Sequence, residues 1–269
     1  MLSLKCNNVH PIANVEPDAR RAAMLLNTSD QRPVEALSKG GYALLAAAEL
    51  KQHLGAASAG LDALRESWSR LPCDNHLRDG GSYRFRRHSC FEHHIASGAL
   101  TMVPHRAHWQ PLDYNALHGG MERWFEPVEP AVAASVAWTQ LLVTLGELFA
   151  RIRPVQLWYV EAHQFRIDTA EGIGRPTPEG AHRDGVDFVA VILVNRGPVR
   201  GGETRVFEAN GTSGVRFTMT EPWTTLLLDD AKVIHETTPI QPIAAAAAGS
   251  GVRDTLVVTF RAGGFQAPG

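Results

Sequence analysis

The chain has 269 residues, of which 44% are hydrophobic and 20% are charged, and its formal net charge is −2. This composition is ordinary for a globular domain and lacks the excess of basic residues found in nucleic-acid-binding proteins. The first residues contain no apolar stretch long enough for a secretory signal peptide, and no later run approaches the length of a membrane span. We therefore expect a cytoplasmic protein that has neither nucleic acid nor a membrane as a partner.

Three cysteines, Cys6, Cys73 and Cys90, are scattered along the chain, and no two of them have the C-x-x-C spacing of a zinc ribbon. An odd number of widely spaced cysteines also speaks against a disulfide framework. The cysteines therefore agree with a reducing compartment, where thiols stay free.

The first half of the chain predicts mainly helices. Residues 1–35 are polar and contain Asn and Pro, so we expect a loosely ordered arm. Residues 40–71 predict a short apolar strand followed by a helix that two internal glycines break into pieces. Residues 82–93 alternate as a strand does, and residues 129–152 predict an apolar helix with a proline at a permitted N-terminal position.

From residue 154 onward, short apolar runs separated by Gly, Pro and Asp replace the helical pattern. The runs are VQLWYVEAHQFRI, FVAVILV, ETRVFEA, GVRFTM, TTLLLDD, KVIHET and TLVVTFR. Such strands with connections of hairpin length are typical of an antiparallel sandwich or barrel. Helices followed by strands indicate the α+β class. We expect one domain over residues 36–269, with a helical layer mainly over 45–152 and a β core over about 154–262.

The stretch EGAHRDGVDF places His182 and Asp184 two residues apart, directly before an apolar strand. In an extended strand such side chains point to the same face. A third candidate ligand is His235, in KVIHETTPI within the strand-rich half. Two imidazoles and one carboxylate form the facial triad that holds Fe(II) and leaves three positions open. The same residue types also bind zinc in hydrolytic sites, so zinc remains an alternative.

The tripeptide HRD also occurs in the catalytic loop of protein kinases, where an Asn follows the Asp by five residues. Val189 occupies that position here, and the chain has no glycine-rich kinase loop and no DFG, so a kinase is excluded. We interpret Asp187, Asp229 and Asp230 as turn and strand-end residues rather than metal ligands.

A cation near the C-terminus favours iron over zinc. Arg253 begins the last apolar run, and Arg261 follows eight residues later on the same face of the strand. A buried arginine can bind the far carboxylate of 2-oxoglutarate through two parallel hydrogen bonds, while the keto acid end chelates the metal.

The order His182-x-Asp184, His235 and Arg253 resembles that of the Fe(II)/2-oxoglutarate-dependent dioxygenases. The local sequence around these residues resembles that of one branch of this family, the bacterial free-amino-acid hydroxylases similar to L-isoleucine dioxygenase. The matching phrases are HQFR, HRDGVDF, VNRGPVRGGE, EPWTTLLLDDAKVIHETTPI and RDTLVVTF. The resemblance covers residues 156–261 well and the N-terminal part weakly. It implies a double-stranded β-helix core of the cupin or jelly-roll type, with supporting N-terminal helices.

The resemblance implies Fe(II), 2-oxoglutarate and O2 as cofactor and co-substrates. His182, Asp184 and His235 would bind the iron, and Arg253 would pair with 2-oxoglutarate in preference to Arg261. Two further groups of candidates could contact the co-substrate: the hydroxyls of Thr237 and Thr259, and the guanidinium of Arg166. Arg166 could bind the substrate instead, or it could be a solvated residue of a strand edge.

A free amino acid is a zwitterion, so its site needs a cation for the carboxylate and an acceptor for the ammonium group. Six residues are candidates for the substrate site: Tyr83, Arg84, Arg86, Gln164, Glu161 and Asp187. Among them Glu161 and Asp187 are the possible ammonium acceptors. The segment 169–181, rich in Gly and Pro, is interpreted as a lid that shields the oxidising centre from water.

The sequence therefore predicts hydroxylation of an unactivated C–H bond of a free L-amino acid, with decarboxylation of 2-oxoglutarate to succinate. Aliphatic or cyclic substrates such as leucine, isoleucine, methionine, proline or pipecolate are expected. Two alternatives stay open. One is the same chemistry on a peptide or a carrier-bound aminoacyl group, and the other is a cupin-like hydrolase that uses zinc. The oligomeric state and the hydroxylated carbon are left open.

Overall fold

The computed structural model describes residues 33–115, 117–243 and 251–268. Most of the predicted N-terminal arm, including Cys6, lies outside these residues. The last three residues of the arm, 33–35, instead begin helix α2 (Pro33–Gly40). Cys73 and Cys90 are free thiols. Within the described ranges, no helix is long and apolar enough to cross a membrane.

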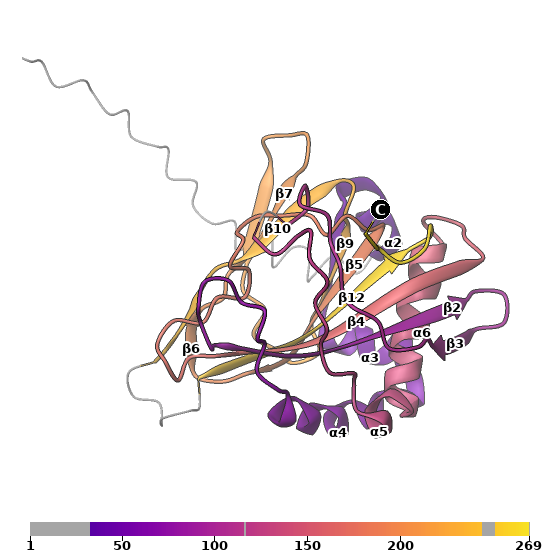
Figure 1. Cartoon of the computed structure of the whole chain (residues 1–269). Helices are drawn as coiled ribbons and strands as arrows, with labels where there is room; N and C mark the ends of the chain where they lie inside the picture. The colour runs from indigo at the N-terminus through magenta and orange to yellow at the C-terminus, as the bar shows by residue number, and fades with distance from the viewer. Residues whose placement is uncertain (1–32, 116, 244–250, 269) are drawn as a thin grey trace, which may run out of the picture.

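The centre of the molecule is a seven-stranded antiparallel sheet, here called the main sheet, in the order β1-β9-β5-β12-β4-β2-β3 (Figure 1). Its strands in this order are β1 (Tyr42–Leu45), β9 (Thr225–Asp229), β5 (Phe188–Arg196), β12 (Val252–Arg261), β4 (Leu157–Asp168), β2 (Arg84–His94) and β3 (Ala99–Met102). Strands β1 and β3 are its two edges. The β core therefore extends beyond the predicted residues 154–262, because the first half of the chain supplies both edges.

Two small sheets complete the barrel. One contains β10 (Val233–Thr237), β7 (Thr204–Glu208) and β8 (Gly214–Phe217), and the other contains β11 (Ile240–Pro242) and β6 (Val199–Gly201). Apolar side chains of β5 and β9 pack against those of β7 and β10, with Val191, Leu226, Val206 and Val233 among them. The predicted double-stranded β-helix of the α+β class is confirmed.

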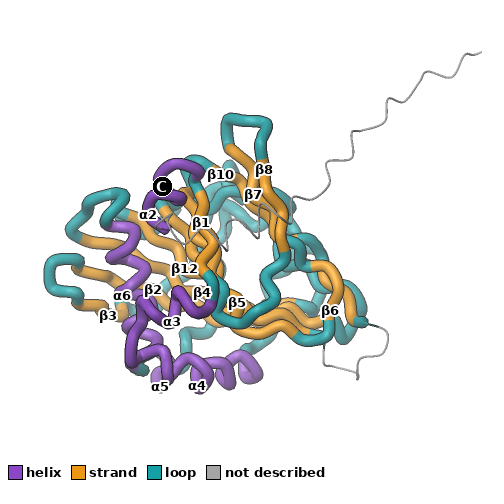
Figure 2. Tube along the Cα trace, turned by 180° about the vertical axis from the view of Figure 1, so that it is seen from behind, coloured by secondary structure: helices purple, strands orange, loops and turns teal. Residues whose placement is uncertain are grey.

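Helices cover the opposite face of the main sheet (Figure 2). They are α3 (Ala47–Leu54), η1 (Gly55–Gly60), α4 (Leu61–Arg65), η2 (Glu66–Arg70), α5 (Pro130–Ala133) and α6 (Val136–Ala150). The predicted helix over 129–152 is divided at Ser135, whose hydroxyl accepts a hydrogen bond from the backbone N–H of Trp138 and so begins α6. Phe149 of α6 stacks on Phe188 with ring centroids 4.6 Å apart, which joins the helical layer to the sheet.

Strand alternation decides which side chains can reach the interior of the barrel. In β12, Arg253 and Thr259 point to the barrel side, whereas Asp254 between them points to the helices. Register carries this alternation into β4, where Glu161 is opposite Thr259 and Ile167 is opposite Arg253. The barrel face of β4 and β12 is therefore unusually polar for the interior of a domain.

Candidate active site

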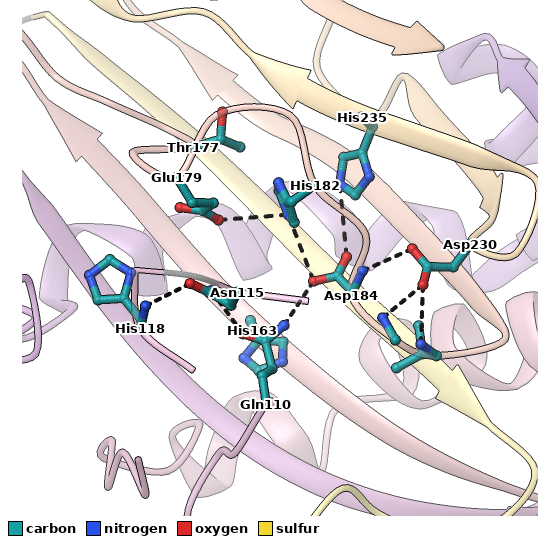
Figure 3. Close-up of polar contacts among 12 residues, drawn as sticks. Gln110, Asn115, His118, His163, Thr177, Glu179, His182, Asp184, Asp230 and His235 are labelled. Carbon is teal, nitrogen blue, oxygen red and sulfur yellow. Dashed lines mark hydrogen bonds and ion pairs between the residues drawn. The ribbon is translucent and has the colours of Figure 1, made fainter. Parts of the chain in front are cut away.

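His182, Asp184 and His235, called the His-Asp-His triad below, meet at one end of the barrel (Figure 3). Two backbone hydrogen bonds of 3.0 Å join His182 to His235 of β10. These bonds bring the two imidazole rings to a centroid distance of 4.6 Å. The Asp184 carboxylate oxygens lie 3.9 Å from Nε2 of His182 and 3.8 Å from Nε2 of His235. The three donor groups surround a common point and could hold a metal ion.

The surrounding hydrogen bonds orient this triad. Nδ1 of His182 lies 3.0 Å from the carbonyl oxygen of Gly180. Because a carbonyl only accepts, Nδ1 carries the proton and Nε2 keeps a lone pair for a metal. The Asp230 carboxylate accepts hydrogen bonds from the backbone N–H groups of Asp184, Gly185 and Val186 at 3.0, 2.8 and 3.2 Å. Asp230 lies in the turn directly after β9, and it holds the turn that carries a ligand.

The electrostatics of the triad suit a cation. Burial, and after it the repulsion of Asp184, raises the pKa of Asp230 to about 6. Burial also raises the pKa of Asp184. For His182, burial opposes protonation, but the carboxylates of Asp184 and Glu179 outweigh it and raise the pKa. Three carboxyl groups crowded into a buried site would be stabilised by a divalent ion.

The triad opens into a cavity on the barrel face of the main sheet, and Arg253, Thr237 and Thr259 line this cavity. Arg253 is 3% exposed, and its Nε and Nη2 atoms have no hydrogen-bond partner among the residues that the structure describes. Burial lowers its pKa to about 10, so it is still charged at neutral pH. A buried guanidinium without partners is costly. An incoming carboxylate would satisfy it.

Four sequence-predicted residues do not line the cavity, and their expected roles are corrected. Arg166 forms two hydrogen bonds of 2.7 and 2.8 Å with Asp254, and Gln164 donates to the Ser67 hydroxyl of η2 at 2.8 Å. Both side chains project from the helical face of β4, one position out of phase with the cavity. Tyr83 and Asp187 are also absent from the lining: the Tyr83 hydroxyl donates to Asp79, and Asp187 pairs with Arg153 and accepts from the backbone N–H of Ala262.

Arg84, Arg86 and Glu161 do line the cavity. Arg84 donates to Asp74 at 2.7 Å. Arg86 donates to Nδ1 of His163 at 2.7 Å, and its guanidinium lies 3.8 Å from the centroid of the Phe125 ring. Arg253, the arginine preferred for the co-substrate, also lines the cavity. The alternative, Arg261, does not line it and donates to the carbonyl of Gly264.

Sequence reasoning missed the segment 105–123, which supplies one wall of the cavity. Its lining residues are His108, Gln110, Asn115, His118 and Arg123. Gln110 donates to Asp184 at 3.2 Å (Figure 3). It also accepts from Arg123 at 2.9 Å, so it links the triad to an arginine. The only signal in the sequence was the density of polar and aromatic residues, because this segment has no helical or strand periodicity.

The segment 169–181, called the lid segment, bonds to β10 and β11 and contributes to the wall of the cavity. Gly174 exchanges two backbone hydrogen bonds with Ile240 of β11. The Thr177 hydroxyl donates to the carbonyl of Thr237 at 3.0 Å and accepts from its N–H at 3.1 Å. Thr177 and Glu179 line the cavity. The segment therefore borders the site, and its role as a lid stays a prediction.

A β-helix with a His-x-Asp pair, a distal His and a following buried Arg defines a class of oxygenases that depend on iron and 2-oxoglutarate. The chain belongs to the 2OG-Fe dioxygenase family, whose model matches residues 65–259. A crystal structure of a bsmA homologue from Methylobium petroleophilum is 55% identical, with a TM-score of 0.84 over 88% of this chain and 94% of that chain.

Two more distant solved structures share the fold. The first is IDO from Bacillus thuringiensis, 18% identical, with a TM-score of 0.69 over 86% of this chain and 95% of that chain. The second is TqaL, an Fe(II)/(alpha)ketoglutarate-dependent dioxygenase, 19% identical, with a TM-score of 0.64 over 89% of this chain and 87% of that chain. No curated protein matches.

Family membership assigns Fe(II), 2-oxoglutarate and O2 to this protein. The residues present fit these groups on two observations of the structure. The triad offers two imidazoles and a carboxylate, the ligand set that non-haem Fe(II) prefers. The unpartnered N–H groups of Arg253 offer the paired donors that a carboxylate of the keto acid requires.

Proposed function

We propose that this protein hydroxylates an unactivated C–H bond of a free L-amino acid, with 2-oxoglutarate decarboxylated to succinate. The general hydroxylation chemistry follows from the family. The free amino acid as substrate is supported by one observation: the cavity that contains the triad is lined by charged groups of both signs that each keep one polar atom without a partner. Nε of Arg86, Nε of Arg123 and Oε2 of Glu179 are buried without a hydrogen-bond partner in the described part of the chain.

Each residue of the site would have a defined task. His182, Asp184 and His235 would hold Fe(II), which with 2-oxoglutarate and O2 supplies the oxidising power for C–H hydroxylation. Arg253 would bind the far carboxylate of 2-oxoglutarate. Thr237 and Thr259 also line the cavity and could each add a hydroxyl donor, but Thr259 lies six residues along β12 from Arg253, opposite Glu161.

The charge balance of the cavity supports a substrate that is neutral overall and zwitterionic. Arg84 is already neutralised by Asp74. Two arginines, Arg86 and Arg123, remain against two carboxylates, Glu161 and Glu179. A free amino acid brings one group of each charge to such a surface. Its apolar side chain would contact the apolar part of the lining, which consists of Phe165, Ile167, Val186, Val191 and Val257.

The alternatives are less well supported by the cavity. A carrier-bound aminoacyl group or an internal residue of a peptide has no free α-carboxylate, so it would leave Nε–H of Arg86 and of Arg123 buried without a partner. A zinc hydrolase would have no use for the buried guanidinium of Arg253. We keep the cytoplasmic location as a prediction that follows from the sequence.

The test is succinate formation by protein loaded anaerobically with Fe(II) and then given O2, 2-oxoglutarate and single L-amino acids. The panel contains leucine, isoleucine, methionine, proline and pipecolate. Stimulation by one member, abolished by His182→Ala, would support the proposal. Succinate formed at a rate that no member changes would contradict a free amino acid substrate and point to a bound aminoacyl group. Absence of succinate throughout would contradict the oxygenase itself.

A further inference from the structure

A second group of histidines around a carboxylate borders the same cavity, and three of its four members line that cavity. It consists of His88, His108, Glu161 and His163, and we call it the Glu161 cluster. All four residues are buried, with exposed fractions between 0% and 8%. Oε2 of Glu161 lies 2.9 Å from Nε2 of His88, 2.8 Å from Nδ1 of His108 and 3.8 Å from Nε2 of His163. By residue type and proximity the cluster resembles a metal site.

The tautomer of His163 contradicts a four-ligand metal site. Arg86 lies with Nη2 2.7 Å from Nδ1 of His163. A guanidinium nitrogen only donates, so Nδ1 must be the acceptor. The proton of the neutral ring is then on Nε2, the atom that faces Glu161, and this nitrogen has no lone pair to give to a metal. Burial, with the neighbouring His88 next, lowers the pKa of His163 well below its usual range and so keeps the ring neutral.

The distances around Glu161 are those of hydrogen bonds. Donor atoms bound to one tetrahedral zinc ion at about 2.0–2.1 Å lie about 3.3 Å from one another. The N···O separations of 2.8 and 2.9 Å to His108 and His88 are shorter and match ordinary hydrogen bonds. Each of these imidazoles therefore donates one N–H to the carboxylate.

The cluster carries one negative charge at neutral pH. Burial opposes ionisation of Glu161, but the two imidazoles that contact it outweigh this effect and lower its pKa far below the usual value. Burial lowers the pKa of His88, and it lowers that of His108 to about 3, so these rings are neutral donors. Both hydrogen bonds end on Oε2, and no described residue donates a hydrogen bond to Oε1. The acid thus keeps one acceptor for a ligand of the cavity.

We propose that Glu161 binds the ammonium group of the substrate, with His88 and His108 as positioning residues that hold its carboxylate. The inference rests on the proposed function and names one of its contacts. Arg123 is the complementary partner for the α-carboxylate, because its Nε has no partner and its Nη2 bonds to Gln110, which contacts Asp184. Fixing both polar groups of the amino acid leaves its side chain free to approach the triad.

The first experiment measures amino acid binding rather than turnover. Wild type and Glu161→Gln are loaded with Fe(II) and 2-oxoglutarate without O2 and titrated calorimetrically. The probe is the panel amino acid that stimulates succinate formation most, or L-leucine if none does. Glutamine keeps the shape and can still accept from both histidines, but it places an amide N–H at the cavity. We expect the Kd for the amino acid to rise roughly 10- to 100-fold, as for the loss of a charged hydrogen bond.

Three comparisons make this result specific. The Kd for 2-oxoglutarate should change less than about twofold in Glu161→Gln, since its carboxylate is assigned to Arg253. The deamino analogue of the probe (4-methylpentanoate for leucine) should bind wild type and Glu161→Gln equally. Glu126→Gln is the matched control, because Glu126 is exposed and pairs with Arg87. It should bind the amino acid as wild type does.

The possible failures can be told apart. Amino acid binding that is equal in wild type and Glu161→Gln overturns the ammonium site and leaves the proposed function standing. Wild type that neither binds nor is stimulated by any panel member overturns both. A second equivalent of Fe(II) or Zn²⁺ in wild type, lost in Glu161→Gln, would overturn the inference by showing that the cluster is a metal site. One equivalent in both proteins supports it.

Discussion

The His-Asp-His triad and the Glu161 cluster contain the same kinds of residue and differ in how their ring nitrogens are bonded. All their members except His88 line one cavity. In the triad, the oxygens of Asp184 lie 3.8 and 3.9 Å from imidazole nitrogens, which is beyond hydrogen-bond distance. In the cluster, one oxygen of Glu161 accepts two hydrogen bonds of 2.8 and 2.9 Å. Room for an ion exists between the donors of the first group but not between the hydrogen-bonded atoms of the second.

The difference is explained by the hydrogen bond of Nδ1, the ring nitrogen that faces away from the carboxylate in His182 and in His163. Nδ1 of His182 donates to a carbonyl, so the lone pair of its Nε2 points into the triad. Nδ1 of His163 accepts from Arg86, so a proton occupies its Nε2. Proximity of histidines and acids therefore selects candidate metal sites, and the outer hydrogen-bond partner decides between them.

The largest expected effect tests this comparison with two histidine substitutions. His182→Ala removes a ligand and should lower activity on the order of 1000-fold or more, because the metal supplies several kcal/mol to the reaction. The His163→Gln variant should still bind one equivalent of Fe(II), because Nε2 of His163 is protonated in the wild type and is therefore not a metal ligand. Metal content after anaerobic loading and desalting is the measurement. Equal loss of iron in both variants would contradict the distinction between the two groups.

The next effect concerns the two arginines of β12. Arg253→Gln should raise the KM for 2-oxoglutarate roughly 30- to 1000-fold, the range for truncating one partner of a buried charge pair. Arg261→Gln is the control, because Arg261 bonds to the Gly264 carbonyl outside the cavity, and its KM should stay within about twofold. A large rise in KM for Arg261→Gln and none for Arg253→Gln would show that 2-oxoglutarate binds at the other end of β12.

A smaller effect is expected from the residue behind the triad. Asp230→Asn replaces one acceptor oxygen with a donor and cannot accept all three backbone hydrogen bonds of the 184–186 turn. We expect Fe(II) affinity to fall roughly 10- to 100-fold, as is usual for groups that orient metal ligands. Asp229→Asn is the neighbouring control, since Asp229 pairs with Lys232. Competition with a metal chelator would measure the Fe(II) affinity of both variants. A similar affinity in the two would contradict the role of Asp230 in holding the turn that carries Asp184.

The sequence predicted the residues of the site better than their surroundings, for physical reasons. His182, Asp184, His235 and Arg253 lie on or beside strands whose apolar runs give a clear periodicity, so their relative order was informative. For β4, the pattern could not decide which face looks into the barrel, because polar residues occupy both faces. Gln164 and Arg166 were therefore placed on the wrong side of the sheet.

The wall formed by residues 105–123 could not be foreseen, because its position is set by tertiary contacts. His108 bonds to Glu161 of β4, 53 residues away in the chain, and Gln110 bonds to Asp184 across 74 residues. Loops of this kind have no period of their own that a single sequence could reveal. The same limit applies to the Glu161 cluster, whose members come from β2, β4 and this wall.

The smallest expected effect is a pH dependence that separates the cluster from the triad. Unfolded His108 takes up a proton near pH 6.5, whereas folded His108 stays neutral until pH about 3. The unfolded state therefore binds more protons throughout this window, and acidification destabilises the fold. From pH 6.5 to 5 this histidine should cost about 1–2 kcal/mol of unfolding free energy, and His88 acts in the same direction.

Denaturant unfolding at pH 6.5 and pH 5, with metal removed, would measure this loss. His108→Asn should flatten the pH dependence, because an amide can still donate to Glu161 but does not titrate. His53→Asn is a control of the same substitution on the exposed surface of α3. A His108→Asn variant that loses as much stability as wild type on acidification would mean that folded His108 takes up its proton in the same pH range as the unfolded chain. In that case His108 would be partly cationic at pH 6.5, and its charge would compete with the substrate's ammonium group for Glu161.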